Sequence, residues 1–233
     1  MSLQVVILAG GLATRLNKIT LTKPKSLIEI NGEPFISHQL RYLKSQGIHK
    51  VHLCLGHLAD QVVETIRDNK NYNLNITYSF DGDSQLGTGG ALKNALSFCD
   101  ESFFVQYGDS YLPIKYSDII NYFLKNNSQK NILTIYKNNG QFDKSNVDYV
   151  ENRKFIYNKS NPSSNMSYID YGLSIFIKKD LENTIFSHIF DLSDIIVELI
   201  NKKMMIPLEV NERFYEIGKV EGIKELNNYL LNK

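Results

Sequence analysis

A pair of glycines followed by cations is the strongest chemical signal in this chain. Gly10 and Gly11 directly follow the short apolar run 4–8, which is typical of a buried parallel strand. Because glycine lacks a Cβ, the backbone can bring its N–H groups close to an anion, and the Thr, Arg and Lys side chains that follow add donors. The segment predicts a triphosphate-binding loop made of Leu8, Ala9, Gly10, Gly11, Thr14, Arg15 and Lys25.

Two common nucleotide-binding motifs do not fit this loop. The dinucleotide fingerprint needs a third glycine, and residues 12–15 contain none. The Walker pattern ending in Gly-Lys-Ser/Thr is absent as well. Because the third glycine is missing, the sequence does not fit a dinucleotide-binding oxidoreductase of similar layered fold.

Two further loops follow strand-like runs. Asp109 comes after the run 103–107, and Gly108 lets the chain turn there. Phosphoryl transfer needs carboxylates for a charge-neutralising Mg²⁺, and Asp109 is the best candidate. The segment 84–92 is rich in glycine, so a flat base can approach its main-chain groups. We expect the base to be read there by Gln85, Gly87 and Gly90.

Together these motifs resemble the signature of the sugar-phosphate nucleotidyltransferases, also called nucleoside-diphosphate-sugar pyrophosphorylases. Residues 10–16 and 23–25 match the pattern Gly-Gly-x-Gly/Ala-Thr/Ser-Arg-Leu and the later Lys-Pro-Lys in order. The resemblance implies Mg²⁺-dependent transfer of a nucleoside monophosphate from an NTP to a sugar 1-phosphate, with release of pyrophosphate. It implies catalytic roles for Arg15, Lys25 and Asp109.

The resemblance also implies a second metal ligand near the carboxyl terminus. Glu216, in the run Tyr215-Glu216-Ile217-Gly218, stands where the family carries Asp. The extra methylene lengthens the reach but keeps the hard oxygen ligands that Mg²⁺ prefers. We therefore expect Asp109 and Glu216 to hold the metal.

Acceptor recognition departs most from the family pattern. Lys159 keeps a cation for the acceptor phosphate, whereas Asn158 replaces a common glutamate. Asp170 adds a carboxylate in the run 168–172, where many relatives carry Asn-Ala-Gly, and Gly172 completes the expected acceptor set. The chain looks most similar to guanylyltransferases that act on heptose or mannose 1-phosphate. Another base, a phosphorylated non-sugar acceptor and a non-catalytic nucleotide-sugar-binding regulatory protein stay open as alternatives.

The order of elements predicts an α/β fold of Rossmann-like type, a mostly parallel sheet flanked by helices, as in nucleotide-diphospho-sugar transferases. We expect one domain over 1–233, in which residues 1–136 bind the nucleotide and residues 137–233 bind the acceptor. Short strands at 148–151, 154–157 and 168–176 predict a small β-rich subregion of hairpins over an edge of the sheet. Helices are expected at 37–46, 60–68, 91–96, 117–126, 192–201 and 220–231.

The composition of the chain limits the binding partners and the compartment that we expect. Lys and Arg number 26 against 25 Asp and Glu, so the overall charge gives no reason to expect nucleic acid or an anionic membrane. The sequence lacks a secretory pattern and an apolar run of about 18 residues, so we expect a cytoplasmic protein. Cys54 and Cys99 are expected as buried thiols, and homo-oligomer formation is left open.

Overall fold

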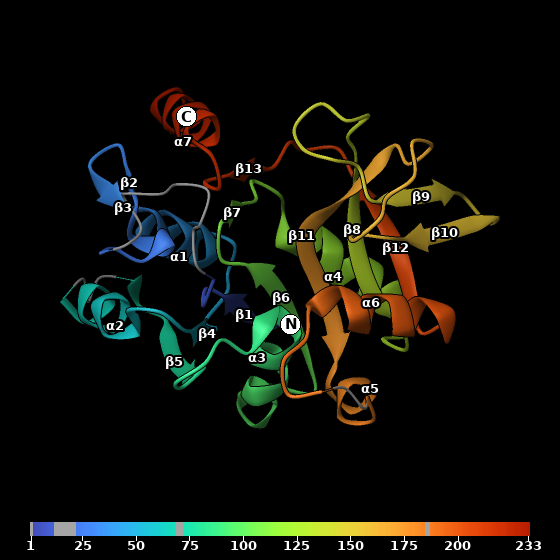
Figure 1. The fold of residues 1–233 in the computed structure, drawn as a ribbon, viewed down its shortest axis with the longest axis horizontal. Coiled ribbons are helices and arrows are strands. Elements are labelled where there is room, and N and C mark those ends of the chain that lie inside the picture. Colours follow the sequence, from blue (N-terminus) through green and yellow to red (C-terminus); the bar gives the residue numbers. More distant parts are fainter. Residues whose placement is uncertain (1, 12–21, 69–71, 185–186) are drawn as a thin grey trace.

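A mostly parallel sheet runs through the centre of the protein (Figure 1). The computed structural model describes residues 2–11, 22–68, 72–184 and 187–233. Strand β1 (Gln4–Leu8) lies between β4 (Lys50–Leu55) and β6 (Ser102–Tyr107) and is parallel to both, and β5 (Asn75–Phe80) continues beyond β4. These short apolar runs are typical of strands that are buried on both faces.

The second half of the chain extends the same sheet. Strand β11 (Tyr168–Ile177) is antiparallel to β6 and to β8 (Asn131–Lys137), and β12 (Met205–Val210) is parallel to β8. The nucleotide-binding and acceptor-binding regions expected from the sequence therefore share one continuous sheet.

One predicted position is wrong. The run 168–176 was expected in a hairpin over the edge of the sheet, but β11 lies centrally, between β6 and β8. Its residues are buried almost throughout, because helices cover both of its faces. The expected edge hairpin is correct for β9 (Val147–Val150) and β10 (Lys154–Tyr157), which pair with each other.

Helices cover both faces of the sheet. Val5 and Ile7 of β1 join a core with α1 (Phe35–Ser45), α2 (Ala59–Asp68) and α4 (Tyr116–Lys125). Val6 and Leu8 point to the other face and join α3 (Gly87–Ala95), α5 (Lys178–Glu182) and α6 (Leu192–Asn201). This alternation along one strand fixes which helices pack on which side.

Several short elements were not predicted. They are the short helix α5, the 3₁₀ turns η2 (Lys25–Leu27) and η4 (Leu96–Phe98), the hairpin of β2 (Glu29–Ile30) and β3 (Glu33–Pro34), and the pair of β7 (Ser110–Tyr111) and β13 (Tyr215–Glu216). The last helix, α7 (Val220–Leu231), packs on β13 and β2 (Figure 1). Helix α3 begins at Gly87 rather than at residue 91.

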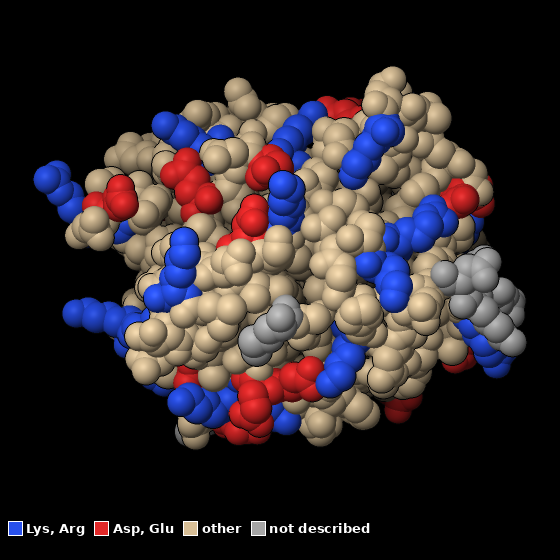
Figure 2. All heavy atoms as spheres, turned by 180° about the vertical axis from the view of Figure 1, so that it is seen from behind, with Lys and Arg blue, Asp and Glu red and all other residues tan. Residues whose placement is uncertain are grey.

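Basic and acidic residues are nearly equal in number, 26 against 25. Figure 2 shows acidic and basic side chains interspersed on the face opposite to that of Figure 1. Cys54 and Cys99 are free and buried, as expected. Of the helices in the described ranges, none combines the length and the apolar character needed to cross a membrane.

Candidate functional site

A cleft of about 720 Å³ opens at the carboxyl ends of β1 and β6. Residues from distant regions of the chain meet there, as expected for the carboxyl edge of parallel strands. Most of the predicted site residues line this cleft: Leu8, Ala9, Gly10, Gly11, Lys25, Gln85, Gly87, Asp109, Lys159, Asp170 and Glu216.

Of the predicted residues that the structure describes, Gly90 and Gly172 are not among the lining residues. Thr14 and Arg15 lie outside the residues that the structure describes. Gly90 faces the carbonyl of His188, which would come within 2.7 Å of an added Cβ. Gly172 has a φ of +90° and packs beside the Tyr107 ring at an irregularity in β11. The two glycines therefore shape the walls around the cleft.

Lys25 and Asp109 form an ion pair in the middle of the cleft. The Lys25 Nζ atom lies 2.6 Å from Asp109 Oδ2, and both side chains are partly buried. Lys25 begins the η2 turn directly after Pro24, and Asp109 follows β6. The Asp109 carbonyl also accepts a hydrogen bond from the Ile217 N–H at 3.0 Å, which ties this turn to the β13 segment.

The small β7–β13 pair brings Glu216 to the same place. Glu216 pairs with Ser110 in this two-stranded sheet, so it lies next to Asp109 despite the distance in sequence. Burial, followed by the charges of Asp109 and Asp143, raises the pKa of Glu216 to about 7, while Lys25 and Lys219 oppose the shift. Two carboxylates are thus held against their mutual repulsion.

This donor set is suitable for a hard divalent cation. Two carboxylates in a partly enclosed site supply the oxygen ligands that Mg²⁺ prefers, and a cation between them would offset both the burial and the repulsion that raise the Glu216 pKa. Within the described ranges, no group of three or more His, Cys, Asp or Glu side chains is arranged to hold a metal. Mg²⁺ commonly completes such a site with water and substrate phosphates.

One end of the cleft is formed by glycines and the β5–α3 loop. The Gln85 amide donates to the carbonyl of Gly10 at 3.2 Å, which joins this loop to the first glycine loop. Asp81, which sequence reasoning missed, also lines the cleft, and its Oδ2 would lie 3.0 Å from a Cβ added at Gly10. Burial raises the pKa of Asp81, although a hydrogen bond from the Leu86 N–H opposes this shift.

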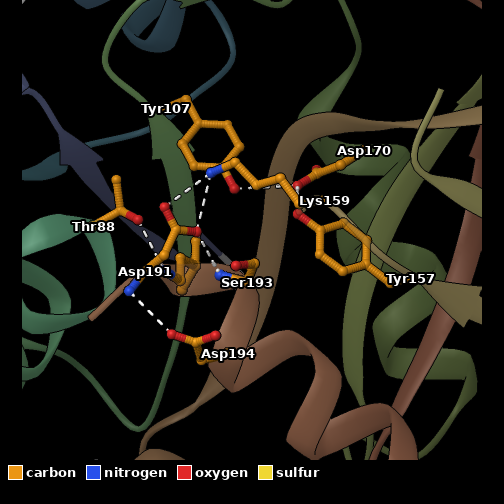
Figure 3. Close-up of polar contacts among 9 residues, drawn as sticks. Thr88, Tyr107, Tyr157, Lys159, Asp170, Asp191, Ser193 and Asp194 are labelled. Atoms are coloured by element: carbon orange, nitrogen blue, oxygen red, sulfur yellow. Dashed lines mark hydrogen bonds and ion pairs between the residues drawn. The ribbon is translucent and has the colours of Figure 1, made fainter. Parts of the chain in front are cut away.

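The other end of the cleft is built around Asp170 (Figure 3). The Tyr107 and Tyr157 hydroxyls donate to Asp170 Oδ2 at 3.2 and 3.5 Å, and the Gly172 N–H donates to Oδ1 at 2.9 Å. Burial raises the pKa of Asp170, against the opposing effects of these hydrogen bonds and of Lys159. The result is a fixed carboxyl group that can accept from polar groups of a ligand.

Lys159 lies beside this carboxyl group. Its Nζ atom is 3.0 and 2.9 Å from the two carboxylate oxygens of Asp191 and 5.9 Å from the centre of the Tyr107 ring. Asp191 caps the amino terminus of α6 by accepting from the Ser193 N–H at 2.9 Å. The Lys159 side chain therefore lines the cleft as the partner of an ion pair with Asp191.

Sequence reasoning missed several lining residues: Asp81, Tyr107, Asp143, Lys144, Asn146, Tyr157 and Asp191. Two of them carried a local signal. Asp81 directly follows β5 and Tyr107 ends β6, so both stand at the strand ends where ligands bind. Asp191 reaches the cleft only through the docking of α6, which no local pattern predicts.

Comparison with known proteins shows the family to which the chain belongs. A family model described as nucleotidyl transferase matches residues 4–143. The chain is 28% identical to D-glycero-alpha-D-manno-heptose 1-phosphate guanylyltransferase of Campylobacter jejuni, over 99% of this chain and 100% of that protein. It is 34% identical over 55% of its length to mannose-1-phosphate guanyltransferase of Yarrowia lipolytica, of which it spans only 36%.

Solved structures give the same result. The crystal structure of HddC from Yersinia pseudotuberculosis complexed with GMP-PN superimposes with a TM-score of 0.80 at 25% identity, covering 98% of this chain and 99% of that one. A protein described as a putative glucose-1-phosphate thymidylyltransferase from Bacillus anthracis shares the fold with a TM-score of 0.82 at 19% identity, covering 97% of this chain and 94% of that one. The chain therefore belongs to the nucleotidyl transferase family, as an enzyme of its sugar-phosphate nucleotidyltransferase branch.

Proposed function

We propose that this nucleotidyltransferase is a Mg²⁺-dependent guanylyltransferase that acts on a heptose or mannose 1-phosphate. The proposal depends on one observation: Lys25, Asp109 and Glu216 come together in the cleft. The glycine loops lie on one side of these three residues, and the acceptor end lies on the other. A cation and two carboxylates at that point match what transfer of a nucleotidyl group requires.

The reaction is a displacement at phosphorus. An oxygen of the acceptor phosphate attacks the α-phosphorus of GTP, and a new P–O bond forms. The bond from the α-phosphorus to the bridging oxygen breaks, and pyrophosphate leaves with that electron pair. Lys25 stabilises negative charge on the phosphates in the transition state, and the glycine loop at Gly10 and Gly11 binds phosphate oxygens through backbone N–H groups.

Asp109 and Glu216 would hold Mg²⁺. When bound, the metal supplies positive charge that neutralises the phosphates and helps to align them. Glu216 must be ionised to act as a ligand, so metal binding would release the proton that its raised pKa favours. Lys25 remains close to Asp109 and keeps part of its charge neutralised.

The acceptor would occupy the end of the cleft that Lys159 and Asp170 form. The Lys159 ammonium suits the acceptor phosphate, and the Asp170 carboxyl group suits a sugar hydroxyl because it has acceptor capacity beyond its two tyrosine partners. A sugar 1-phosphate carries both kinds of group. The relatives named for heptose and mannose 1-phosphate support this class of acceptor.

Asp81 supports guanine as the base. It lines the cleft beside Gly10, three residues before the segment 84–92 that is expected to read the base. The Watson–Crick edge of guanine carries two neighbouring donors, N1–H and N2–H₂, which a carboxylate can accept together. Uracil and thymine offer a single N–H flanked by carbonyls, so they match this carboxylate less well.

Pyrophosphate release by the purified protein tests the proposal. GTP, UTP, CTP and dTTP would each be paired with mannose 1-phosphate, D-glycero-α-D-manno-heptose 1-phosphate and glucose 1-phosphate, with and without Mg²⁺. We expect Mg²⁺-dependent release with GTP and one of the first two acceptors, a GDP-sugar by mass spectrometry, and no turnover by Asp109→Asn.

Two results would contradict it. A faster reaction with another NTP or with glucose 1-phosphate would refute the substrate assignment. Calorimetric binding of a nucleotide sugar without turnover of any pair would instead favour a regulatory binding protein.

A further inference from the structure

The segment just before α6 contacts both ends of the cleft. On the nucleotide side, the Phe190 N–H donates to the Leu86 carbonyl at 3.1 Å, and the Phe190 carbonyl accepts from the Gly89 and Gly90 N–H groups at 3.0 and 3.3 Å. The Leu192 N–H donates to the Thr88 hydroxyl at 2.8 Å. Residues 190–192 are therefore bonded to the loop that is expected to read the base.

Residue 190 packs closely on the glycines of this segment. A Cβ added at Gly87 would lie 2.3 Å from the Phe190 carbonyl oxygen, and one added at Gly89 would lie 2.4 Å from the Phe190 ring. Neither position has room for a side chain, so the two segments approach each other closely. The glycines of this loop thus serve the docking of residue 190 as well as the approach of a base.

The next residue contacts the acceptor end. Asp191 binds Lys159 through both carboxylate oxygens, at 3.0 and 2.9 Å (Figure 3). The same carboxylate caps α6, and the Asp191 N–H donates back to Asp194 at 3.2 Å. Because this capping box fixes the carboxylate on the helix, Asp191 sets where the Lys159 ammonium stands.

We propose that residues 190–192 couple the binding of the nucleotide to the binding of the acceptor, with Asp191 as the positioning residue. The inference rests on the proposed function, because it needs a base at the first turn of α3 and an acceptor phosphate at Lys159. A base that fixes the first turn of α3 also fixes residues 190–192 and hence Lys159. By linkage, the acceptor must favour nucleotide binding by the same factor.

Two substitutions, one at each end of the cleft, distinguish coupling between the two substrates from an effect on one substrate alone. Asp191→Ser keeps a helix-capping side chain but is too short to hold Lys159. Thr88→Val keeps the shape of the side chain but removes the acceptor of the Leu192 N–H. The matched control is Asp100→Ser, which breaks the Lys50–Asp100 pair, whose exposure is similar and which lies outside the cleft.

The central measurement is the cross-effect on the two substrates. We expect Asp191→Ser to raise KM for GTP as well as for the sugar 1-phosphate, and Thr88→Val to raise KM for the sugar 1-phosphate as well as for GTP. Each cross-effect should be about fivefold, the lower end of typical coupling between sites. The double variant should show less than the product of the single effects, because both changes act through one segment. Asp100→Ser should change neither KM.

Calorimetry provides a readout without turnover. In the unaltered protein a non-hydrolysable GTP analogue should tighten sugar 1-phosphate binding by about fivefold or more, and this factor should fall toward one in both single variants. Asp191→Asn, which keeps the cap and a hydrogen-bonding oxygen, should be intermediate and guards against misfolding of the serine variant.

The outcomes are distinct. If each variant raises only the KM of its own substrate and the effects multiply, the coupling is wrong while the proposed function stands. If the unaltered protein turns over no NTP and sugar 1-phosphate pair, the proposed function is wrong. Calorimetry would still test the coupling in that case. Equal affinity for the sugar 1-phosphate with and without the GTP analogue would show that the two sites are not coupled.

Discussion

Lys25 and Asp109 lie 84 positions apart in the chain, yet their Nζ and Oδ2 atoms are 2.6 Å apart in the folded protein. The pair joins the η2 turn to the end of the central strand β6. Glu216 adds a second carboxylate through the β7–β13 pair. The Lys25 ammonium therefore lies at a point of the cleft where two negative side chains come together.

Replacing Lys25 should abolish most of the activity. Lys25→Met keeps much of the side-chain volume but removes the charge that stabilises the phosphates, so kcat/KM for GTP should fall by about 10²–10³-fold. Lys23→Met is the matched control, because Lys23 pairs with Glu29 at an exposed position. Steady-state kinetics at saturating Mg²⁺ should show little change in the control. Equal losses in the two variants would mean that Lys25 has no special role.

The raised pKa of Glu216 predicts how stability depends on pH. In the folded protein the pKa rises from 4.5 to about 7, so the fold favours the protonated acid. The stabilisation from this proton is complete below pH 4.5, declines between pH 4.5 and 7, and is lost above that range. In metal-free buffer, Glu216→Gln should therefore raise Tm at pH 8 by roughly 5–10 °C and change it little at pH 4.5.

Mg²⁺ should remove the advantage in Tm that Glu216→Gln has over the unaltered protein at pH 8. At pH 8 the added cation should stabilise the unaltered protein by binding the ionised pair, and it should stabilise Glu216→Gln much less. Glu212→Gln, at an exposed position of the same segment, controls for the loss of one negative charge. Equal Mg²⁺-induced shifts of Tm in Glu216→Gln and in the unaltered protein would remove Glu216 from the metal site.

Asp170 should control the acceptor rather than the nucleotide. Asp170→Asn replaces an oxygen with an NH₂ group that faces the Tyr107 and Tyr157 hydroxyls, so the hydroxyl-binding geometry is lost. We expect KM for the sugar 1-phosphate to rise about 10–100-fold, the effect of one lost hydrogen bond to a charged group, while KM for GTP stays within about threefold. Tyr168→Phe removes an exposed hydroxyl of the same strand and serves as the control. A rise confined to KM for GTP would contradict the assignment.

The sequence predicted the features of the site that depend on local chemistry. Gly10, Asp109 and Glu216 each follow or form a strand within a recognisable pattern, and the fold class follows from the alternation of strands and helices. The central place of β11 was not predictable in this way, because a long buried strand looks the same at the edge of a subregion as in the middle of a sheet. Sheet order depends on pairing between distant segments.

The cleft residues that the sequence did not predict are also placed by contacts between distant segments. Asp191 is a helix cap by its local pattern, and only the docking of α6 against the β5–α3 loop and Lys159 gives it a place in the cleft. The β7–β13 pair is too short to leave a periodic pattern, although it brings Glu216 to Asp109. Such contacts arise from packing, so a single sequence could not predict them.

Base choice should depend on Asp81. The carboxylate lies against Gly10 and Gly56, where an added Cβ would come within 3.0 and 2.9 Å of Oδ2, so the absence of two side chains gives it access to the cleft. Asp81→Asn keeps the size of the side chain but replaces one acceptor with a donor that would face the guanine N1–H or N2–H₂. We expect kcat/KM for GTP to fall about 10–100-fold, the discrimination typical of one bidentate pair, and kcat/KM for UTP to change much less. Asp83→Asn, an exposed neighbour outside the cleft, should leave the GTP-to-UTP ratio unchanged. A fall of similar size for both nucleotides would mean that Asp81 supports the loop without reading the base.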